Sequence, residues 1–254
     1  ADGAVGWRRW TVRRLLRVGT VVFDCDSTLS AVEGIEELAR RHGASVRDLT
    51  EAVMRGEIPM EEVYSRRLAI VQPTRSDVEA LKRIYIDNLV PDARETVRAL
   101  LDEGIQVRIM SAGIRAAVEA LADELGLPAR AVAAVDVTFD EKGEYDDFDA
   151  ASPLTWAYGK RELLRVWRSE IGGSFMMVGD GATDLEAADA ADVFVAYAGV
   201  VDRPAVTAEA DVVIRTASLA PVLPLALGGH PPRRAFNRAL FEKGLELLEP
   251  EYRS

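Results

Sequence analysis

The chain has 254 residues, a length that suits one domain with a small inserted module better than two full-sized domains. Apolar residues make up 48% of the chain and charged residues 29%, which excludes disorder, collagen or a coiled coil as a description of the whole. A net charge of −11 disfavours general binding to DNA or RNA, and no apolar run is long enough to span a membrane.

The N-terminal residues differ from the rest of the chain in charge. The first 20 residues hold five arginines against one acid, Asp2, so we expect residues 1–18 to form a basic extension. Arginines interrupt every apolar stretch there, which excludes a secretory signal. An exposed extension, a remnant of organelle targeting and a partner-binding or membrane-surface arm all stay open. The single cysteine, Cys25, excludes an intramolecular disulfide and fits a reducing compartment, so we expect a cytoplasmic protein.

In chain order, the pattern begins with one strand and then turns helical. The β-rich run over 19–24 predicts a buried strand that ends in an acid. Helices follow without an intervening strand, over 32–41, 46–55, 60–71 and 76–88. Helices and strands then alternate. The later predicted helices cover 92–103, 114–125, 160–170 and 182–188, the strands 105–110, 132–137, 174–178, 193–196 and 212–214, and a hairpin 137–139 and 145–148.

This order predicts an α/β fold, a Rossmann-like parallel sheet covered by helices on both faces. Residues 31–89 interrupt it after the first strand, so we expect them to form a small helical-bundle cap over the ligand-binding edge of the sheet. The catalytic core then comprises 19–30 and 90–225. Residues 226–254 form a tail, in which 233–248 resemble one amphipathic helix that packs on the body or makes a dimer contact.

Two acidic motifs follow two of the predicted strands. Asp24 and Asp26 belong to the run DCDST after the first strand, and Asp180 and Asp184 to the run GDGATD after the strand over 174–178. Parallel strands end at one edge of a sheet, and carboxylates gathered there suit Mg²⁺. An aspartate so placed can also attack phosphorus, while its neighbour transfers protons. A dinucleotide-binding loop is disfavoured because acids repel a pyrophosphate. A structural turn with solvated acids stays open.

Two further residues would balance this negative charge. Ser111, with Ala112 and Gly113, is expected to open a helix that holds phosphate oxygens. Lys160 opens another predicted helix and could pair with both a phosphate and Asp24. Considered alone, Ser111 would be explained as a helix cap and Lys160 as a solvated lysine. Their order between the two acidic motifs favours phosphate binding instead. A receiver domain uses similar groups but has about half this length and lacks the helical insertion.

In this order the motifs resemble those of the haloacid dehalogenase superfamily and, within it, the phosphoserine phosphatase subfamily. The resemblance runs from about Val21 to Ile214. It implies a Mg²⁺-dependent phosphomonoester hydrolase in which Asp24 is the nucleophile and forms an aspartyl-phosphate, and Asp26 is the general acid and then the base. It implies Mg²⁺ ligation by Asp24, the backbone carbonyl of Asp26 and Asp180, supported by Asp184. It implies phosphoryl binding by Ser111, Gly113 and Lys160.

The resemblance also places substrate choice in the cap. Glu33 matches the residue that meets the ammonium group of serine, and Arg67 matches the partner of its carboxylate, a pair that suits a zwitterion. Further substrate contacts are expected from Met54, Met60 and Thr183. The implied reaction converts O-phospho-L-serine to L-serine and phosphate, a step of serine biosynthesis.

The sequence departs from the subfamily pattern at Arg55, Ala112 and Val135. These departures leave open another small phosphomonoester, or a phosphotransferase that passes the phosphoryl group to an alcohol other than water. A capped phosphate-binding scaffold without catalysis is a third alternative. We expect a small-molecule partner, no nucleic acid and no membrane span, and the sequence leaves open whether the chain is a homodimer.

Overall fold

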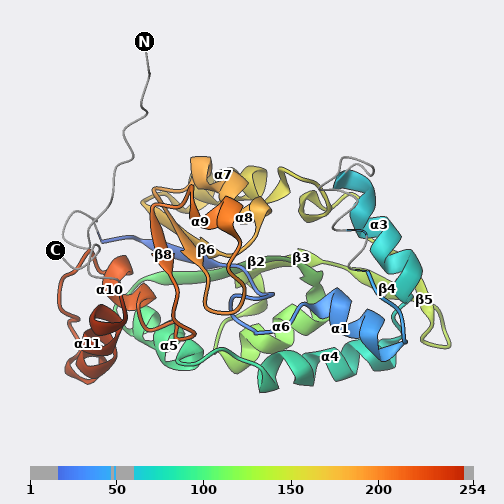
Figure 1. Ribbon diagram of the computed structural model, residues 1–254, viewed down its shortest axis with the longest axis horizontal. Helices are drawn as coiled ribbons and strands as arrows, with labels where there is room; N and C mark the ends of the chain where they lie inside the picture. The colour runs from blue at the N-terminus through green and yellow to red at the C-terminus, as the bar shows by residue number, and fades with distance from the viewer. Residues whose placement is uncertain (1–16, 47–48, 50–59, 249–254) are drawn as a thin grey trace, which may run out of the picture.

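The computed structural model describes residues 17–46, 49 and 60–248, and it confirms the α/β fold (Figure 1). Over the described residues, the centre is a six-stranded parallel sheet. Its strands are β1 (Thr20–Phe23), β2 (Gln106–Ile114), β3 (Val132–Val135), β6 (Phe175–Gly179), β7 (Val193–Tyr197) and β8 (Val212–Ile214). They lie in the order β3-β2-β1-β6-β7-β8.

β1 lies in the middle of the sheet, and its register with β2 and β6 brings the loops that follow these strands together. All four of its residues are buried, as expected for a β-branched and aromatic run covered on both faces. Phe23 is aligned with Ile109 of β2 and with Val178 of β6. The Asp24 N–H then donates to the Val178 carbonyl at 2.9 Å, so the loops after β1 and β6 begin side by side.

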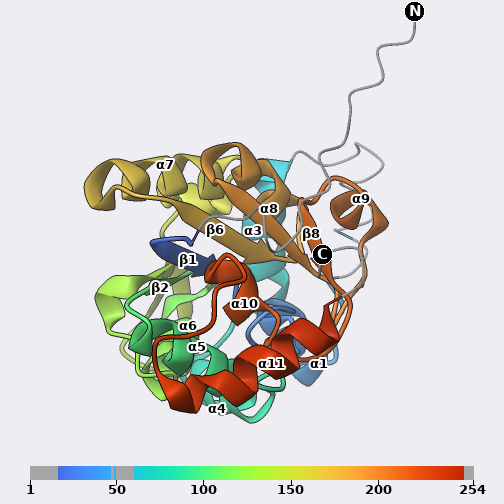
Figure 2. The same cartoon turned by 90° about the vertical axis from the view of Figure 1, so that its left-hand side faces the viewer.

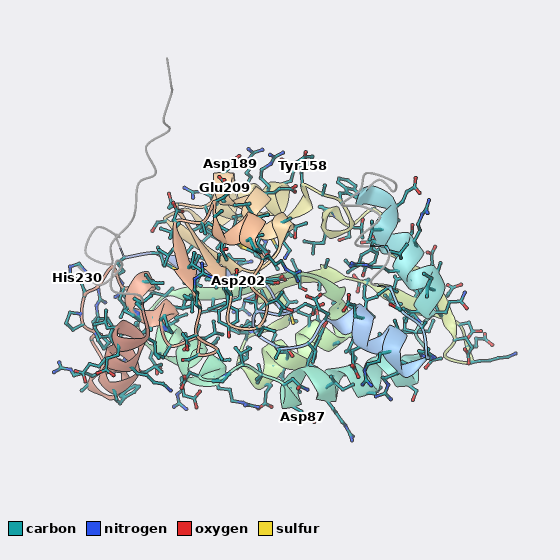
Figure 3. All side chains as sticks on the ribbon, in the orientation of Figure 1. Asp87, Tyr158, Asp189, Asp202, Glu209 and His230 are labelled. Atoms are coloured by element: carbon teal, nitrogen blue, oxygen red, sulfur yellow. The ribbon has the colours of Figure 1, made fainter. Side chains whose placement is uncertain are left out.

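Helices cover both faces of the sheet. On one face lie α4 (Arg75–Asp87), α5 (Ala93–Asp102) and α6 (Arg115–Glu124) (Figures 1 and 2). On the other lie α7 (Gly159–Ile171), α8 (Ala182–Ala187) and the short α9 (Pro204–Thr207). Figure 3 shows the two faces by their side chains, with Asp87 on one side of the molecule and Tyr158 and Asp189 on the other. The sheet is therefore shielded from water except at its ends.

The segment after β1 contributes α1 (Gly34–Arg41), α3 (Met60–Val71) and α4. Thr74 is the N-cap of α4, and its hydroxyl accepts from the Asp77 N–H at 3.2 Å in a capping box. Its buried side chains, Val78, Leu81 and Tyr85, recur at helical spacing, and the helix packs along α6 of the core. That residues 31–89 act as one cap stays a prediction.

The predicted hairpin forms and contacts this segment. It consists of β4 (Val137–Phe139) and β5 (Tyr145–Phe148), which pair antiparallel. The ring centres of Phe148 and of Tyr64 in α3 lie 5.1 Å apart, and the Arg75 guanidinium of α4 lies 5.5 Å from the centre of the Phe139 ring. The hairpin thereby joins α3 to α4 through aromatic contacts.

One predicted boundary near the site is wrong. Ser111-Ala112-Gly113 was expected to open a helix, but these residues continue β2, and α6 begins only at Arg115. The pairing of β2 with β3 shifts register between Met110 and Ile114, an irregularity that the short side chains in between allow. Ser111 therefore reaches the site from a strand end and not from a helix N-terminus.

The C-terminal region also differs from the prediction. A short helix, α10 (Val222–Ala226), was not predicted, and 233–248 do not form one helix. A 3₁₀ turn over Ala235–Asn237 precedes α11 (Arg238–Leu247). The buried Glu103 carboxylate accepts from the N–H groups of Arg233 and Arg234 at 2.8 and 2.9 Å, which fixes them outside the helix. α11 packs against α10, as the body-packing alternative expected.

Some predictions fall outside the described residues. They include residues 1–16 of the predicted basic extension and most of the helix expected over 46–55, with Met54 and Arg55. Within the described ranges, no helix combines the length and the apolar character needed to cross a bilayer.

Candidate active site

The site is centred on Asp24, the first residue after β1. The residue is 8% exposed, and its Oδ1 accepts from the Cys25 N–H at 2.7 Å. The apolar strand before it can be buried completely, whereas the carboxylate needs polar partners, so the strand delivers the acid to the edge of the sheet. This is the placement that the sequence predicted.

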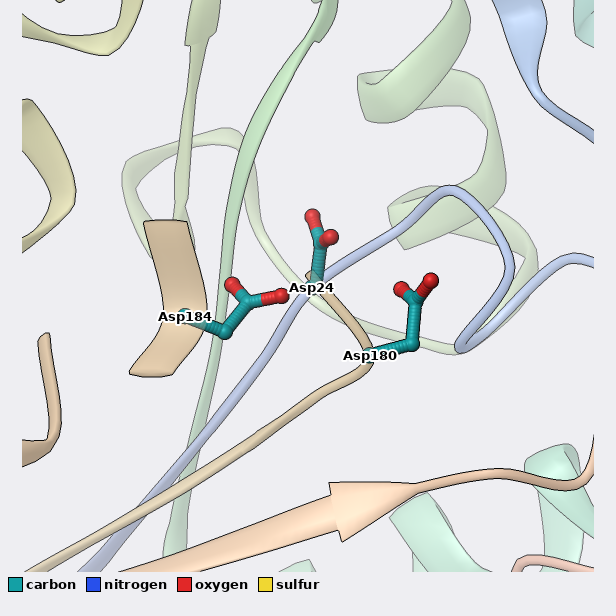
Figure 4. Close-up of side chains that lie close together, drawn as sticks. All are labelled: Asp24, Asp180 and Asp184. Carbon is teal, nitrogen blue, oxygen red and sulfur yellow. The ribbon is translucent and has the colours of Figure 1, made fainter. Parts of the chain in front are cut away.

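Asp180 and Asp184 reach the same point from the loop after β6. Gly179 leaves room for them, since a Cβ at that position would lie 2.3 Å from the carboxyl carbon of Asp184. The Gly181 N–H donates to Asp184 Oδ2 at 2.9 Å and fixes the turn. Each of the carboxylates of Asp24, Asp180 and Asp184 offers an oxygen within 4.8 Å of the others (Figure 4). The cluster therefore joins Asp24 of the first acidic motif to both acids of the second.

Lys160 balances part of this charge. Its ammonium group lies 2.9 Å from Asp24 Oδ1 and 2.6 Å from Asp184 Oδ1, and the residue is only 4% exposed. Burial alone would lower its pKa, but the two carboxylates outweigh that effect and raise it. Lys160 thus stays charged at the start of α7, as the prediction of an Asp24 partner required.

The negative charge that Lys160 does not balance changes the pKa values of Asp180 and Asp184. Burial raises the pKa of Asp180 to about 6, with a further rise from Asp24 and an opposing effect of Arg203. Burial and Asp24 likewise raise the pKa of Asp184, and Lys160 only partly opposes them. A hard divalent cation among these oxygens would relieve the repulsion, so the residues present fit Mg²⁺.

Sequence analysis missed Arg203 and Thr28. Arg203 Nε donates to Asp180 Oδ2 at 2.9 Å, and its Nη2 donates to Glu33 Oε1 at 3.1 Å. Thr28 Oγ1 donates to Asp180 Oδ1 at 3.2 Å. Arg203 follows β7 just before α9, so the rule that strand ends converge could have pointed to it. The arginine links the acidic cluster to Glu33, the predicted ligand of the substrate ammonium.

The Asp26 carboxyl is not part of the cluster and has partners of its own. Its Oδ2 accepts from the Gly34 N–H at 3.0 Å, and its Oδ1 accepts from the hydroxyl of Tyr85, another residue that sequence analysis missed. Burial and the nearby charge of Glu33 raise the pKa of Asp26, which favours the protonated form. A carboxyl group that holds a proton can act as a general acid. This geometry is compatible with metal contact through the Asp26 backbone carbonyl alone.

Ser111 and Gly113, two of the predicted phosphate-binding residues, and Thr183, a predicted substrate contact, come from two different elements. Ser111 is buried at the end of β2, and its Oγ accepts from the Gly113 N–H at 3.0 Å. Thr183 lies partly exposed in the first turn of α8, and its Oγ1 would be 3.9 Å from a Cβ at Gly181. These placements are compatible with the predicted roles, which stay predictions.

Arg67 lies half-buried on α3. One turn before it, Tyr64 is buried, and its hydroxyl has no hydrogen-bond partner within the described part of the chain. Burial and the charge of Asp26 raise the pKa of Tyr64, and Arg67 lowers it, so both charges lie close to this ring. Met60 begins α3, but its side chain is outside the described set.

A buried carboxylate, a lysine bound to it and further carboxyl groups thus lie together at one edge of a Rossmann-like sheet. The family model of haloacid dehalogenase-like hydrolases matches residues 18–192. The chain therefore belongs to the haloacid dehalogenase-like hydrolases. This confirms the family resemblance found in the sequence.

Within this family, the chain is similar to several phosphoserine phosphatases. The chain is 38% identical to the phosphoserine phosphatase of Mus musculus over 72% of its length and 83% of the relative. It is 37% identical to a chloroplastic phosphoserine phosphatase of Arabidopsis thaliana over 76% of the chain and 68% of the relative. A solved structure described as a phospho-aspartyl intermediate analogue of phosphoserine phosphatase is 26% identical, with a TM-score of 0.69, and the match covers 82% of this chain and 98% of that one.

Proposed function

We propose that the chain is a Mg²⁺-dependent phosphomonoester hydrolase that converts O-phospho-L-serine to L-serine and phosphate, a step of serine biosynthesis. The observation that carries the proposal is the contact of Lys160 with Asp24 and Asp184 inside a cluster of buried carboxylates. The similarity to phosphoserine phosphatases supports the substrate.

The proposed reaction has two steps on the residues of the chain. Asp24 attacks the phosphorus, the bond from phosphorus to the serine oxygen breaks, and Asp26 gives its proton to that oxygen. Water then attacks the aspartyl-phosphate, Asp26 takes a proton from the water, and phosphate leaves with Asp24 restored. Lys160 and the Ser111-to-Gly113 strand end hold the phosphoryl oxygens.

Mg²⁺ would be held by Asp24, Asp180 and the Asp26 backbone carbonyl, with Asp184 in support. When bound, it supplies positive charge that lets a phosphate dianion approach the acidic cluster. Glu33 and Arg67 bind the ammonium and carboxylate groups of serine. We further propose that residues 31–89 form a cap and that the protein is cytoplasmic and does not bind nucleic acid. Whether it forms a homodimer stays open.

The deciding experiment measures phosphate release from L-phosphoserine with Mg²⁺, beside a panel of small phosphomonoesters with and without acceptor alcohols. A preference for phosphoserine supports the proposal. Release from another ester alone would keep the mechanism and change the substrate. Transfer to an added alcohol in place of release would identify a phosphotransferase instead.

Arg67→Ala should raise KM for phosphoserine by about 10- to 100-fold and change kcat by less than about 3-fold, because the contact is made equally in the ground and transition states. Steady-state kinetics measure both constants. Arg66→Ala is the matched control, since Arg66 lies next to it on α3 and forms an exposed pair with Glu62. A large fall in kcat at unchanged KM would contradict the assigned role.

Mg²⁺ should stabilise the protein more at about pH 7.5 than at about pH 5. The folded-state pKa of Asp180, about 6, lies above its ordinary value of 3.8. Without metal, the stability linked to Asp180 is therefore present below about pH 4 and is lost as the pH rises through about 6. The cation offsets this loss only where the carboxylate is ionised.

The difference can be measured as the shift in thermal midpoint on adding Mg²⁺ at each pH. At about 100 times the Kd, the expected stabilisation at the higher pH is about 2.7 kcal/mol. Asp180→Asn should remove most of the pH dependence. Equal shifts at both pH values would argue against Asp180 as a ligand.

A further inference from the structure

Tyr85 is a buried tyrosine that none of the motifs in the sequence includes. It lies near the end of α4, and its side chain is 0% exposed. Its Oη lies 2.5 Å from Asp26 Oδ1 and donates a hydrogen bond to it. The other carboxyl oxygen, Oδ2, accepts from the Gly34 N–H at 3.0 Å. The Asp26 carboxyl is thus held at both oxygens, one of them by this phenol.

The phenol oxygen lies in a space that two glycines leave for it. A Cβ at Gly34 would be 2.1 Å from Tyr85 Oη, and a Cβ at Gly113 would be 3.1 Å from it. Gly34 begins α1 beside Glu33, whereas Gly113 belongs to the predicted phosphate-binding end of β2. Tyr85 therefore places its hydroxyl between the Asp26 loop and the strand end where a phosphoryl group would bind.

The backbone around Tyr85 is tied to the same loop. Ser30 Oγ donates to the Tyr85 carbonyl at 3.1 Å, and the Ala31 N–H donates to the Asn88 carbonyl at 2.8 Å. The Val90 N–H donates to the Leu29 carbonyl at 3.0 Å. Because these bonds join the end of α4 to the segment that carries Asp26, the phenol and the carboxyl keep a fixed relative position.

We propose that Tyr85 is a positioning residue for the proton transfers of Asp26. The inference rests on the proposed function, since it concerns the acid and base of that reaction. The phenol occupies one lone pair of Oδ1 and the Gly34 N–H one of Oδ2, which fixes the plane of the carboxyl toward the leaving oxygen. In this proposal Tyr85 acts through Asp26 and does not contact the substrate.

The effect should be largest in the first step. There the bond from phosphorus to the ester oxygen breaks, the proton of Asp26 moves to that oxygen, and a carboxylate remains. Hydrogen bonds from Tyr85 and Gly34 stabilise this carboxylate as it forms.

Tyr85→Phe keeps the ring and removes only the hydroxyl. First-turnover rates are measured by rapid quench on two esters that differ in leaving group. With phosphoserine, whose alkoxide must be protonated, the rate at saturation should fall by about 10- to 100-fold while half-saturation changes by less than about 3-fold. With p-nitrophenyl phosphate, whose leaving group departs without a proton, the rate should change by less than about 3-fold.

Tyr197→Phe is the matched control, because it also removes a buried hydroxyl, one that donates to the Ala217 carbonyl. It should leave both rates unchanged. An equal loss on both esters in Tyr85→Phe would reduce Tyr85 to a structural role and overturn the proposal. A rise in half-saturation at unchanged rate would make it a substrate contact and also overturn it.

A double-mutant cycle tests whether the effect passes through Asp26. In an Asp26→Asn background, adding Tyr85→Phe should change the phosphoserine rate by less than about 3-fold. A further loss as large as in the wild type would overturn the proposal. If the wild type releases no phosphate from phosphoserine, the proposed substrate is wrong. Tyr85→Phe and the wild type are then compared on whichever alkyl phosphomonoester the wild type hydrolyses. Inactivity on every ester would overturn both.

Discussion

Asp24→Ala is expected to abolish phosphate release from phosphoserine, with a loss of at least about 10⁴-fold in kcat, because no other described side chain can replace the nucleophile. The fold should survive. Asp24 raises the pKa of both Asp180 and Asp184, so removing its charge relieves repulsion in the absence of metal. Lys160 keeps its contact with Asp184 at 2.6 Å.

The experiment pairs a phosphate-release assay with a thermal melt of the metal-free protein. Asp189→Ala serves as the control, since Asp189 is an exposed aspartate on the α7 and α8 side of the molecule (Figure 3). It should leave turnover and melting unchanged. Residual turnover in Asp24→Ala above a few per cent of the wild type would exclude Asp24 as the nucleophile.

Lys160→Met should destabilise the metal-free protein by about 3–5 kcal/mol, because it leaves two buried carboxylates without their shared cation. It should also lower kcat by more than about 10²-fold, since the phosphoryl group loses a positive charge in a water-poor site. Mg²⁺ should restore part of the stability and little of the turnover, because the cation replaces charge but not the lysine's contacts.

Chemical denaturation with and without Mg²⁺ measures the first effect, and steady-state kinetics the second. Lys142→Met removes an exposed lysine in the hairpin turn and should change the free energy of unfolding by less than about 0.5 kcal/mol. If Lys160→Met unfolded at the same denaturant concentration as the wild type, the charge balance inferred for the site would be wrong.

The strand-end acids were predictable because parallel strands impose one geometry. Once β1 and β6 were recognised as neighbouring parallel strands, Asp24 and Asp180 had to lie at the same edge of the sheet. Lys160 followed from its place between the acidic motifs. The structure brings Lys160 within 2.9 Å of Asp24, as its predicted role requires.

Tyr85 carried no readable signal, and the place of Arg203 after β7 did not by itself identify its partners. Tyr85 follows Val78 and Leu81 at helical spacing, a pattern that predicts only a core residue. Its partner depends on how α4 docks against the Asp26 loop. Arg203 pairs with Asp180 and Glu33, which are 23 and 170 residues away along the chain. Local pattern does not specify contacts at such separations.

By itself, the sequence determined the fold class, the acidic motifs and their order, because hydrophobic periodicity and strand-end chemistry are local properties. Only the tertiary structure decided that Ser111 ends a strand, that Arg203 joins the acidic cluster to Glu33 and that Tyr85 holds Asp26. Each of these depends on the docking of distant segments, where burial leaves a polar group only the partners that packing brings within reach.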